Sequence, residues 1–353
     1  MKILILEPFY GGSHKQLIDL IQQSVKEKDL ELITQTAKKW HWRARSSAVW
    51  YSQKIEDNVG RYSHIFSSSV LNLCELFGLR PDLKSARSIL YFHENQLVYP
   101  VQTVQDRDFQ FGYNQILSAL AADELLFNSE YNLSSFLQNI PKHFKIQPDF
   151  KPDTKIIVKK IRDKSRVLYF PIYEELKLLD LGEKNSSDVL HIVWAHRWEH
   201  DKNPESFFQA LYTLHEEGFS FKISVLGETY SQVPPIFEEA RSILSDHILQ
   251  FGFAKTKEEY YSILRDGDVI VSTAIHEFFG VSMLEGFYLG CFPLVPNRLV
   301  YPEIYSEECI YNTDTQLYKK LRNFIRNPSA LRSRKIFTDF QKFSIKPFLT
   351  LFE

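Results

Sequence analysis

Segment 268–296, DVIVSTAIHEFFGVSMLEGFYLGCFPLVP, constrains the fold more than any other part of the chain. The β-branched run Val269 to Thr273 predicts a buried strand. A short helix is expected to begin near Gly280 and to end at Gly290, before another strand. This order forms one strand-loop-helix-strand unit of a parallel sheet. Ligands of such sheets bind at the carboxyl ends of the strands, where a helix N-terminus offers N–H groups to a phosphate.

Two glutamates flank the start of this helix. Glu277 lies in the loop and Glu285 lies one turn inside the helix, so both can reach a ligand at the helix N-terminus. A carboxylate can accept both hydroxyls of a vicinal diol, which suits Glu285 for a ribose and Glu277 for a sugar ring. Taken alone, the pair favours a simpler explanation, in which Glu277 complements the helix dipole and Glu285 is solvated. The rest of the chain reverses that preference.

The composition is that of a globular protein with two domains. The 353 residues are 44% hydrophobic and 24% charged, and the formal net charge of −2 excludes a protein that is basic throughout. Three scattered cysteines suit a reducing compartment rather than a disulfide framework or a zinc site. No apolar run has the length of a signal peptide or a membrane span. We expect a cytoplasmic protein that contacts no membrane and needs no obligate protein partner.

Strands and helices alternate along the chain, which is the pattern of doubly wound α/β domains. Strands are expected at 2–6, 30–34, 65–68, 88–92, 124–127 and 167–170, and then at 191–195, 221–226, 248–251 and 269–273, with one more before Pro296. The predicted organisation is an N-terminal domain 1–172, a linker 173–188, a C-terminal domain 189–330 and a helical region 331–353. Asn203 is expected to cap the helix that Pro204 begins. Thr256 and Glu259 predict a capping box for a later helix.

Two segments of the N-terminal half are rich in cations. Segment 32–55 has no acidic residue and interleaves Lys38, Lys39, Arg43, Arg45 and Lys54 with Trp40, Trp42, Trp50 and Tyr51. Segment 141–166, expected on the surface, includes Lys159, Lys160 and Arg162. Cations beside exposed aromatic rings suit a nucleic-acid backbone and unstacked bases. The alternatives are a helix whose tryptophans enter the core and a solvated run of charges.

Further candidate residues follow predicted strands. Gly11 and Gly12 lie in the turn after the first strand, where they allow a ligand to approach the backbone or simply make a tight turn. His93 lies where parallel sheets present catalytic groups, although a loop histidine bonded to backbone is the alternative. Arg197 and Lys202 follow the first strand of the second half. Two fixed cations there can neutralise a diphosphate, and an ordinary polar loop is the competing explanation.

In combination, these features resemble the donor site of retaining GT-B glycosyltransferases of carbohydrate-active family four. The pattern consists of R-x4-K after a strand, E-x7-E, the Gly-Gly turn and the strand-end histidine. Longer blocks resemble the glycosyltransferase-like proteins identified as tRNA-queuosine α-mannosyltransferases. These blocks are MKILILEPFYGGSHKQL, YFHENQLVYPVQ, FQFGYNQILSALAADELLFNSEYN, WAHRWEHDKNP and STAIHEFFGVSMLEGFYLGCFPLVPNRLVYPEIY. They extend from Met1 to about Tyr311.

The resemblance implies the fold, the reaction and the roles of residues. It implies two Rossmann-like doubly wound domains that face across a cleft. It also implies transfer of mannose from GDP-mannose, with retention, onto the cyclopentene-diol of queuosine at the wobble position of tRNA-Asp. Donor contacts would come from Arg197, Lys202, Glu277, Gly280, Val281, Ser282 and Glu285, with Gly11, Gly12 and His93 closing the sugar site. Acceptor RNA contacts would come from Lys38, Lys39, Trp42, Arg43, Arg45, Lys159, Lys160 and Arg162.

No cofactor and no divalent metal are expected. The run Asp266-Gly267-Asp268 has the form of a D-x-D metal motif, but it precedes its strand at the edge away from the expected ligand. Asp268 is therefore interpreted as a turn residue. His196 stands where family four usually has a glycine before the diphosphate arginine. Segment 251–254, FGFA, is the positional candidate for reading the donor base.

Three alternative functions stay open. The first is a nucleotide-sugar glycosyltransferase that acts on a polysaccharide or a lipid. The two basic segments argue against it, and the lack of an apolar amphipathic anchor argues against a lipid. The second is a nucleotide-sugar epimerase of the same architecture. The third is a non-catalytic RNA-binding protein that keeps a nucleotide pocket.

Overall fold

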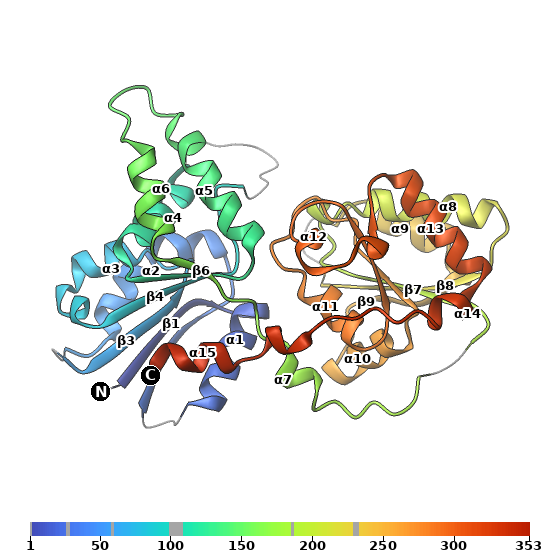
Figure 1. Ribbon diagram of the computed structural model, residues 1–353, viewed down its shortest axis with the longest axis horizontal. Helices are drawn as coiled ribbons and strands as arrows, with labels where there is room; N and C mark the ends of the chain where they lie inside the picture. The colour runs from blue at the N-terminus through green and yellow to red at the C-terminus, as the bar shows by residue number, and fades with distance from the viewer. Residues whose placement is uncertain (1, 26–28, 58–59, 99–108, 185–186, 229–232) are drawn as a thin grey trace. The chain divides into compact units, whose positions relative to one another are not determined.

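The computed structural model describes residues 2–25, 29–57, 60–98, 109–184, 187–228 and 233–353. The chain forms two compact units, the first made of Met1–Pro171 with Phe343–Glu353 and the second of Ile172–Lys342. Within the described residues, each unit contains a parallel six-stranded sheet with helices on both faces (Figure 1). This arrangement confirms the doubly wound α/β fold.

The first sheet has the strand order β2-β1-β3-β4-β5-β6. Its strands are β1 Lys2–Tyr10, β2 Leu30–Thr36, β3 Tyr62–Ser68, β4 Arg87–Phe92, β5 Glu124–Phe127 and β6 Ser165–Val167. Its main helices are α1 Gly12–Ser24, α2 Trp40–Lys54, α3 Leu73–Leu79, α4 Phe109–Ala121, α5 Glu130–Phe144 and α6 Thr154–Arg162. The last strand begins two residues before the expected segment, because its pairing with β5 starts at Ser165, opposite Leu125.

The second sheet has the strand order β12-β11-β10-β7-β8-β9. Its strands are β7 Leu190–Ala195, β8 Phe221–Leu226, β9 Ile248–Gly252, β10 Val269–Val271, β11 Phe292–Pro296 and β12 Ile310–Tyr311. Its helices include α7 Tyr173–Leu176, α8 Pro204–Glu216, α9 Ile236–Ile243, α10 Lys257–Asp266, α11 Val281–Tyr288, α12 Tyr301–Ile304, α13 Asp314–Arg326 and α14 Pro328–Arg332. The predicted strand-loop-helix-strand unit is thus β10, α11 and β11.

One of the two predicted helix caps is confirmed and the other is wrong. The Thr256 side chain caps α10 by accepting a hydrogen bond from the Glu259 N–H at 3.1 Å. The Glu259 carboxylate accepts in return from the Lys255 N–H at 2.7 Å, one residue before the position that a capping box uses. Asn203 makes no such bond to α8. Its backbone is left-handed, with φ of 49°, whereas a capping side chain needs an extended backbone. The Asn203 amide instead donates to Ser206 Oγ at 2.8 Å.

The C-terminal residues pack on the first sheet. Helix α15, Lys346–Leu349, lies beside α1 (Figure 1). The Phe348 ring lies 5.4 Å from that of Tyr91, and the Phe352 ring lies 6.1 Å from that of Phe66. Residues 343–353 therefore complete the core of the first unit. None of the helices in the described part of the chain is long and apolar enough to cross a membrane.

Candidate functional site

Lys202 is the centre of the site in the second unit. It is buried just after β7, and its Nζ donates to the His276 carbonyl at 2.8 Å and to Glu277 Oε2 at 3.3 Å. The same Nζ lies 3.2 Å from Asp201 Oδ2. Thr273 Oγ1 donates to the Lys202 carbonyl at 2.8 Å. The loops that follow β7 and β10 are therefore joined around one ammonium group.

Both carboxylates beside Lys202 are ionised. Burial would raise the pKa of Glu277, but Lys202, His196, the Phe279 N–H and His276 together outweigh it and lower that pKa to about 2. Backbone N–H groups of Phe278 and Phe279 add to this effect by donating to Glu277 Oε1 at 3.1 and 3.4 Å. For Asp201, burial is outweighed by His276 and Lys202, so its pKa lies below the ordinary value. One ammonium and two carboxylates leave a local charge of −1, so Lys202 alone does not make this site attractive to an anion.

Arg197 supplies a second cation at the same edge of the sheet. Its side chain is 43% exposed, and Nη2 lies 3.2 Å from Glu199 Oε2. His196, which precedes it, is buried, and burial followed by the charge of Lys202 lowers its pKa to about 4, so this imidazole is neutral at pH 7. A Cβ on Gly227 would lie 1.9 Å from the His196 carbonyl oxygen. The backbone at Gly227 therefore approaches the His196 carbonyl too closely for any side chain at position 227.

The N-terminus of α11 lies beside Glu277. Gly280 begins this helix with a left-handed φ of 79°, and a Cβ there would meet the Glu277 side chain at 3.6 Å. Ser282 Oγ donates to the Ala195 carbonyl at 2.6 Å, which ties the helix to the end of β7. Since the first N–H groups of a helix have no partner within it, those of Val281 and Ser282 suit an anion.

The Glu285 side chain in α11 is not solvated, in contrast to the simpler explanation of the sequence. Its side chain is buried, Oε2 accepts from the Tyr260 hydroxyl at 2.8 Å, and Oε1 accepts from the Tyr261 hydroxyl at 3.3 Å. Burial raises the pKa of Glu285 to about 7, against the opposing effect of the Tyr260 hydrogen bond. These two tyrosines could not be predicted as partners of Glu285, because their positions depend on how α10 packs on α11.

A second cluster lies in the first unit, at the carboxyl ends of β1 and β4. Glu7 Oε1 accepts from the Phe9 N–H at 2.8 Å and from Ser68 Oγ at 3.0 Å, and it lies 3.2 Å from His14 Nδ1. The His14 ring stacks on His93, with centroids 3.9 Å apart. Burial would lower the pKa of His14, but Glu7 raises it above the ordinary value. Burial and the neighbouring His14 hold the pKa of His93 well below its usual range.

The sequence predicted His93 but missed Glu7 and His14. One ligand atom from each of the three lies within 4.8 Å of the other two, so the set could approach a metal ion. However, the two imidazole planes are inclined by only 26°, and stacked rings do not direct their nitrogen lone pairs at a common point. The hydrogen-bonded pair of Glu7 and His14, stacked on His93, accounts for the arrangement more directly.

Local structure explains why positions 11 and 12 are both glycine. A Cβ on Gly11 would lie 2.4 Å from the Ala37 Cβ, and Gly12 has a left-handed φ of 52°. These observations favour the tight turn. Contact of Gly11 and Gly12 with a donor stays a prediction.

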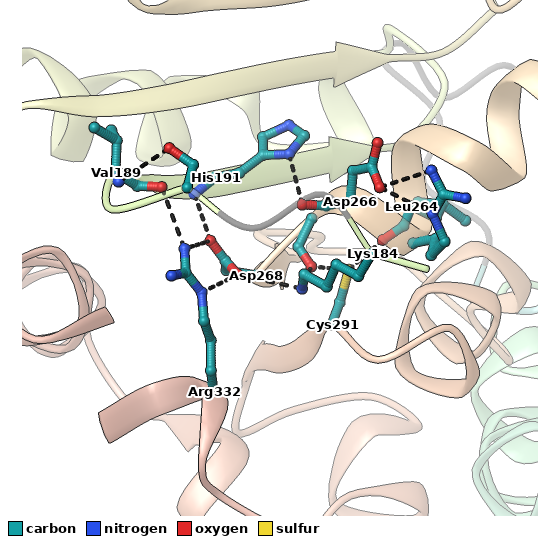
Figure 2. A network of polar contacts seen from close by, with 11 residues as sticks. Lys184, Val189, His191, Leu264, Asp266, Asp268, Cys291 and Arg332 are labelled. Atoms are coloured by element: carbon teal, nitrogen blue, oxygen red, sulfur yellow. Dashed lines mark hydrogen bonds and ion pairs between the residues drawn. The ribbon is translucent and has the colours of Figure 1, made fainter. Parts of the chain in front are cut away.

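The Asp266-Gly267-Asp268 run belongs to a structural network (Figure 2). Arg332 Nε and Nη2 donate to the two Asp268 carboxylate oxygens at 2.8 Å each, and the His191 N–H donates to Oδ2 at 2.9 Å. Lys184 Nζ lies 3.2 Å from Oδ1. Asp268 is therefore more than a turn residue, because it joins β7, β10 and α14 at the amino ends of the strands.

The cation-rich segments combine surface and core residues. Trp42 is 56% exposed, whereas Trp40 and Trp50 are half-buried, so each of the two interpretations holds for part of α2. Arg43 is engaged with Thr36, and Arg45 stacks 4.6 Å from the Phe111 ring centroid. The exposed cations of the predicted set are Lys38, Lys39, Lys159, Lys160 and Arg162. In segment 141–166 the structure adds α6, whose Ile161 is fully buried.

Comparisons with known proteins agree with this architecture. Residues 2–172 match the family described as tRNA-queuosine alpha-mannosyltransferase N-terminal. The chain is 48% identical over 341 residues to a Drosophila melanogaster protein named tRNA-queuosine alpha-mannosyltransferase, covering 94% of this chain and 89% of that protein.

Solved structures of low sequence identity show the fold. Anabaena Alr3699/HepE in complex with UDP and glucose is 13% identical, with a TM-score of 0.64 over 99% of both chains. OtsA, in its apo structure, is 11% identical, with a TM-score of 0.63 over 94% of this chain and 93% of its own. Both are GT-B glycosyltransferases, so the two sheets form a GT-B fold. On the strength of the extended similarity to the Drosophila protein, the chain belongs to the tRNA-queuosine α-mannosyltransferase family.

Proposed function

We propose that this protein transfers mannose from GDP-mannose to the cyclopentene-diol of queuosine at the wobble position of tRNA-Asp. The observation that carries the proposal is the 48% identity to the Drosophila tRNA-queuosine alpha-mannosyltransferase, which extends over 94% of the chain. A tRNA substrate also agrees with the exposed Lys38 and Lys39 just before α2, with the exposed Lys159, Lys160 and Arg162 of α6, and with the expectation of a cytoplasmic protein.

The donor would bind at the carboxyl edge of the second sheet. Arg197 and the N–H groups at the start of α11 would attract the diphosphate, while Lys202 offsets the charges of Asp201 and Glu277 and holds them in place. The ionised Glu277 would accept hydrogen bonds from hydroxyls of the transferred sugar. The Glu285 carboxylate would accept the ribose hydroxyls.

The transfer itself would break one bond and form another on the same face of the sugar. The bond between the anomeric carbon and the diphosphate oxygen breaks, and the queuosine hydroxyl oxygen bonds to that carbon, with retention. The departing diphosphate oxygen takes the proton of the hydroxyl. Arg197 and the α11 N-terminus stabilise the charge that builds on the diphosphate, and the proposed chemistry includes no divalent metal.

The decisive experiment uses radiolabelled GDP-mannose and two tRNA pools, one that contains queuosine and one that lacks it. Label in the queuosine pool alone is the expected result. Label in both pools would remove queuosine as the acceptor, and label in neither, with donor binding intact, would point to another acceptor.

A further inference from the structure

A tyrosine hydroxyl connects the buried Glu285 to a second carboxylate. The Tyr261 hydroxyl lies 3.3 Å from Glu285 Oε1 and 3.1 Å from Glu175 Oε1. Because a phenol carries one hydrogen, it can donate to only one of these two carboxylates at a time. Tyr261 is buried, and the Glu175 side chain is only 23% exposed. The protonation of Glu285 and the hydrogen bonding of Glu175 therefore depend on each other through this hydroxyl.

Lys257 holds Glu175 at this position. Its ammonium group forms an ion pair with Glu175 Oε1, the same oxygen that accepts from Tyr261. The Lys257 side chain is 62% exposed, so solvent screens this pair. Lys257 and Tyr261 lie one turn apart in α10, and Glu175 thus contacts α10 at two neighbouring points.

Glu175 belongs to α7, which begins at the second residue of the second unit. The Tyr173 ring, at the start of α7, lies 6.3 Å from that of Tyr288 in α11. Helix α7 therefore contacts α10 through Glu175 and α11 through Tyr173. The segment in which the chain enters the second unit is thus linked directly to the surroundings of Glu285.

We infer that Glu175 is a positioning residue of the donor site, which sets through the Tyr261 hydroxyl how readily Glu285 takes its ribose-binding form. A protonated Glu285 can donate to Tyr261 while Tyr261 donates to Glu175. An ionised Glu285, the form that accepts both ribose hydroxyls, competes with Glu175 for the Tyr261 hydrogen. The inference rests on the proposed function in that Glu285 holds the ribose of the donor.

The charges around Glu285 act in the directions that this link requires. The titratable groups that face it are Tyr260, Tyr261 and Lys257 of α10 and Glu175 of α7. Burial is the main cause of the raised pKa of Glu285, the charge of Glu175 raises it further, and that of Lys257 lowers it. The two members of the ion pair should therefore have opposite effects when each is removed.

The test follows the Glu285 carboxyl directly, with no donor present. In protein labelled with carbon-13 at the glutamate carboxyls, the Glu285 signal is the one that disappears in Glu285→Gln, and it is titrated from pH 5 to 9. Glu175→Gln should move this titration to lower pH by about one unit, because a like charge is removed and the Tyr261 hydrogen is freed for Glu285. Lys257→Ala should move it to higher pH, and by less, because the lysine is largely exposed.

Two further variants test the route and provide the control. Tyr261→Phe removes the shared hydroxyl, so the shift caused by Glu175→Gln should be smaller in this background than in the wild type. Glu258→Gln neutralises an exposed carboxylate of the same helix and should leave the titration unchanged. Thermal unfolding checks that each variant is folded.

Donor binding gives a second measurement. Since only the ionised Glu285 binds the ribose, Glu175→Gln should lower the Kd for GDP-mannose about fivefold at pH 6 and leave it unchanged at pH 8.5. A Kd raised at both pH values would show a purely structural role and overturn the inference. So would a Glu285 titration equal to that of the wild type, or a shift of the same size with and without the Tyr261 hydroxyl. If the titration moves as expected but the protein binds no GDP-mannose at either pH, the proposed donor is wrong and the link between Glu175 and Glu285 stands.

Discussion

The imidazole of His14 stacks on that of His93 with centroids 3.9 Å apart, while Glu7 Oε1 lies 3.2 Å from His14 Nδ1. The pKa of His14 is raised and that of His93 is lowered, so over part of the pH range one ring is charged and the other neutral. A neutral His93 can accept or donate one hydrogen bond, as contact with a sugar hydroxyl requires. When His14 is protonated, its pairing with Glu7 holds the positive charge on His14 and not on His93, the ring that would contact the sugar.

The first prediction concerns Glu7→Gln. This change removes the charge that raises the pKa of His14, so His14 should titrate at lower pH in a histidine NMR titration. A raised histidine pKa stabilises the fold below the unfolded-state pKa, and this contribution is lost as pH rises through the folded-state pKa. The substitution should therefore cost about 2 kcal/mol of unfolding free energy at pH 5.5 and less at pH 8.5. In the control Ser68→Ala, His14 should keep its raised pKa, and an unchanged titration in Glu7→Gln would reject the assignment.

The second prediction separates the two cations of the donor site. Arg197→Ala should lower kcat/KM by roughly 10²- to 10³-fold and leave the unfolding free energy within about 0.5 kcal/mol, since the side chain is partly exposed. Lys202→Ala should lose as much activity and also roughly 3 kcal/mol of stability, because two half-buried carboxylates lose their counter-charge. Steady-state kinetics and chemical unfolding measure both effects. Arg241→Ala, on the exposed face of α9, is the control, and near-normal turnover in Arg197→Ala would disprove its role.

The third prediction is a pH dependence of donor binding. Glu285 has a pKa of about 7, and only its ionised form accepts both ribose hydroxyls. KM for GDP-mannose should therefore fall as pH rises through 7, and Glu285→Gln should remove this dependence. Tyr260→Phe deletes a hydroxyl that donates to the carboxylate, so it should move the transition to higher pH. The same group makes the fold less stable as pH rises from 4.5 to about 7, because the protonated form is favoured when folded. A flat wild-type profile between pH 6 and 8 would contradict the assignment.

The fourth prediction concerns salt. Each phosphate contact contributes about 0.7 to 0.9 to the slope of log affinity against log salt concentration. The triple variant Lys159→Ala, Lys160→Ala and Arg162→Ala should reduce this slope for tRNA by more than one unit, with the KM for GDP-mannose unchanged. Lys319→Ala in α13 removes an exposed cation from the second unit and serves as the control. A slope equal to that of the wild type would remove α6 from the RNA surface.

The fifth prediction concerns Asp268 and metal dependence. Asp268→Ala leaves Arg332 and Lys184 without their shared carboxylate, so it should cost roughly 3–5 kcal/mol of unfolding free energy. The folded fraction should keep its turnover, and the wild-type rate should not change in EDTA. Activity that EDTA abolishes and Mn²⁺ alone restores would show that the reaction does need a metal.

Local sequence signals predicted the elements that position the donor site. The β-branched run predicted the start of β10 at Val269, and Gly280 marks the start of α11, but the strand ends at Val271 and not at Thr273 as predicted. The strand Glu124–Phe127 has its predicted bounds. The Glu7, His14 and Ser68 contacts could not be predicted, because parallel pairing of β1 with β3 brings together residues 61 positions apart. The left-handed Asn203 and the tyrosines on Glu285 likewise depend on packing between elements. Helix α6 was missed because its buried contact comes mainly from Ile161 among surface cations.

The return of residues 343–353 to the first sheet affects how the protein is made. During translation the second unit is synthesised before Phe348 and Phe352. Until then, Tyr91 and Phe66 lack the rings that pack on them in the folded protein. An apolar strip on the nascent first unit then stays accessible to chaperones for the whole synthesis of residues 172–342. The first unit, although synthesised first, therefore completes its core last, when residues 343–353 pack on it.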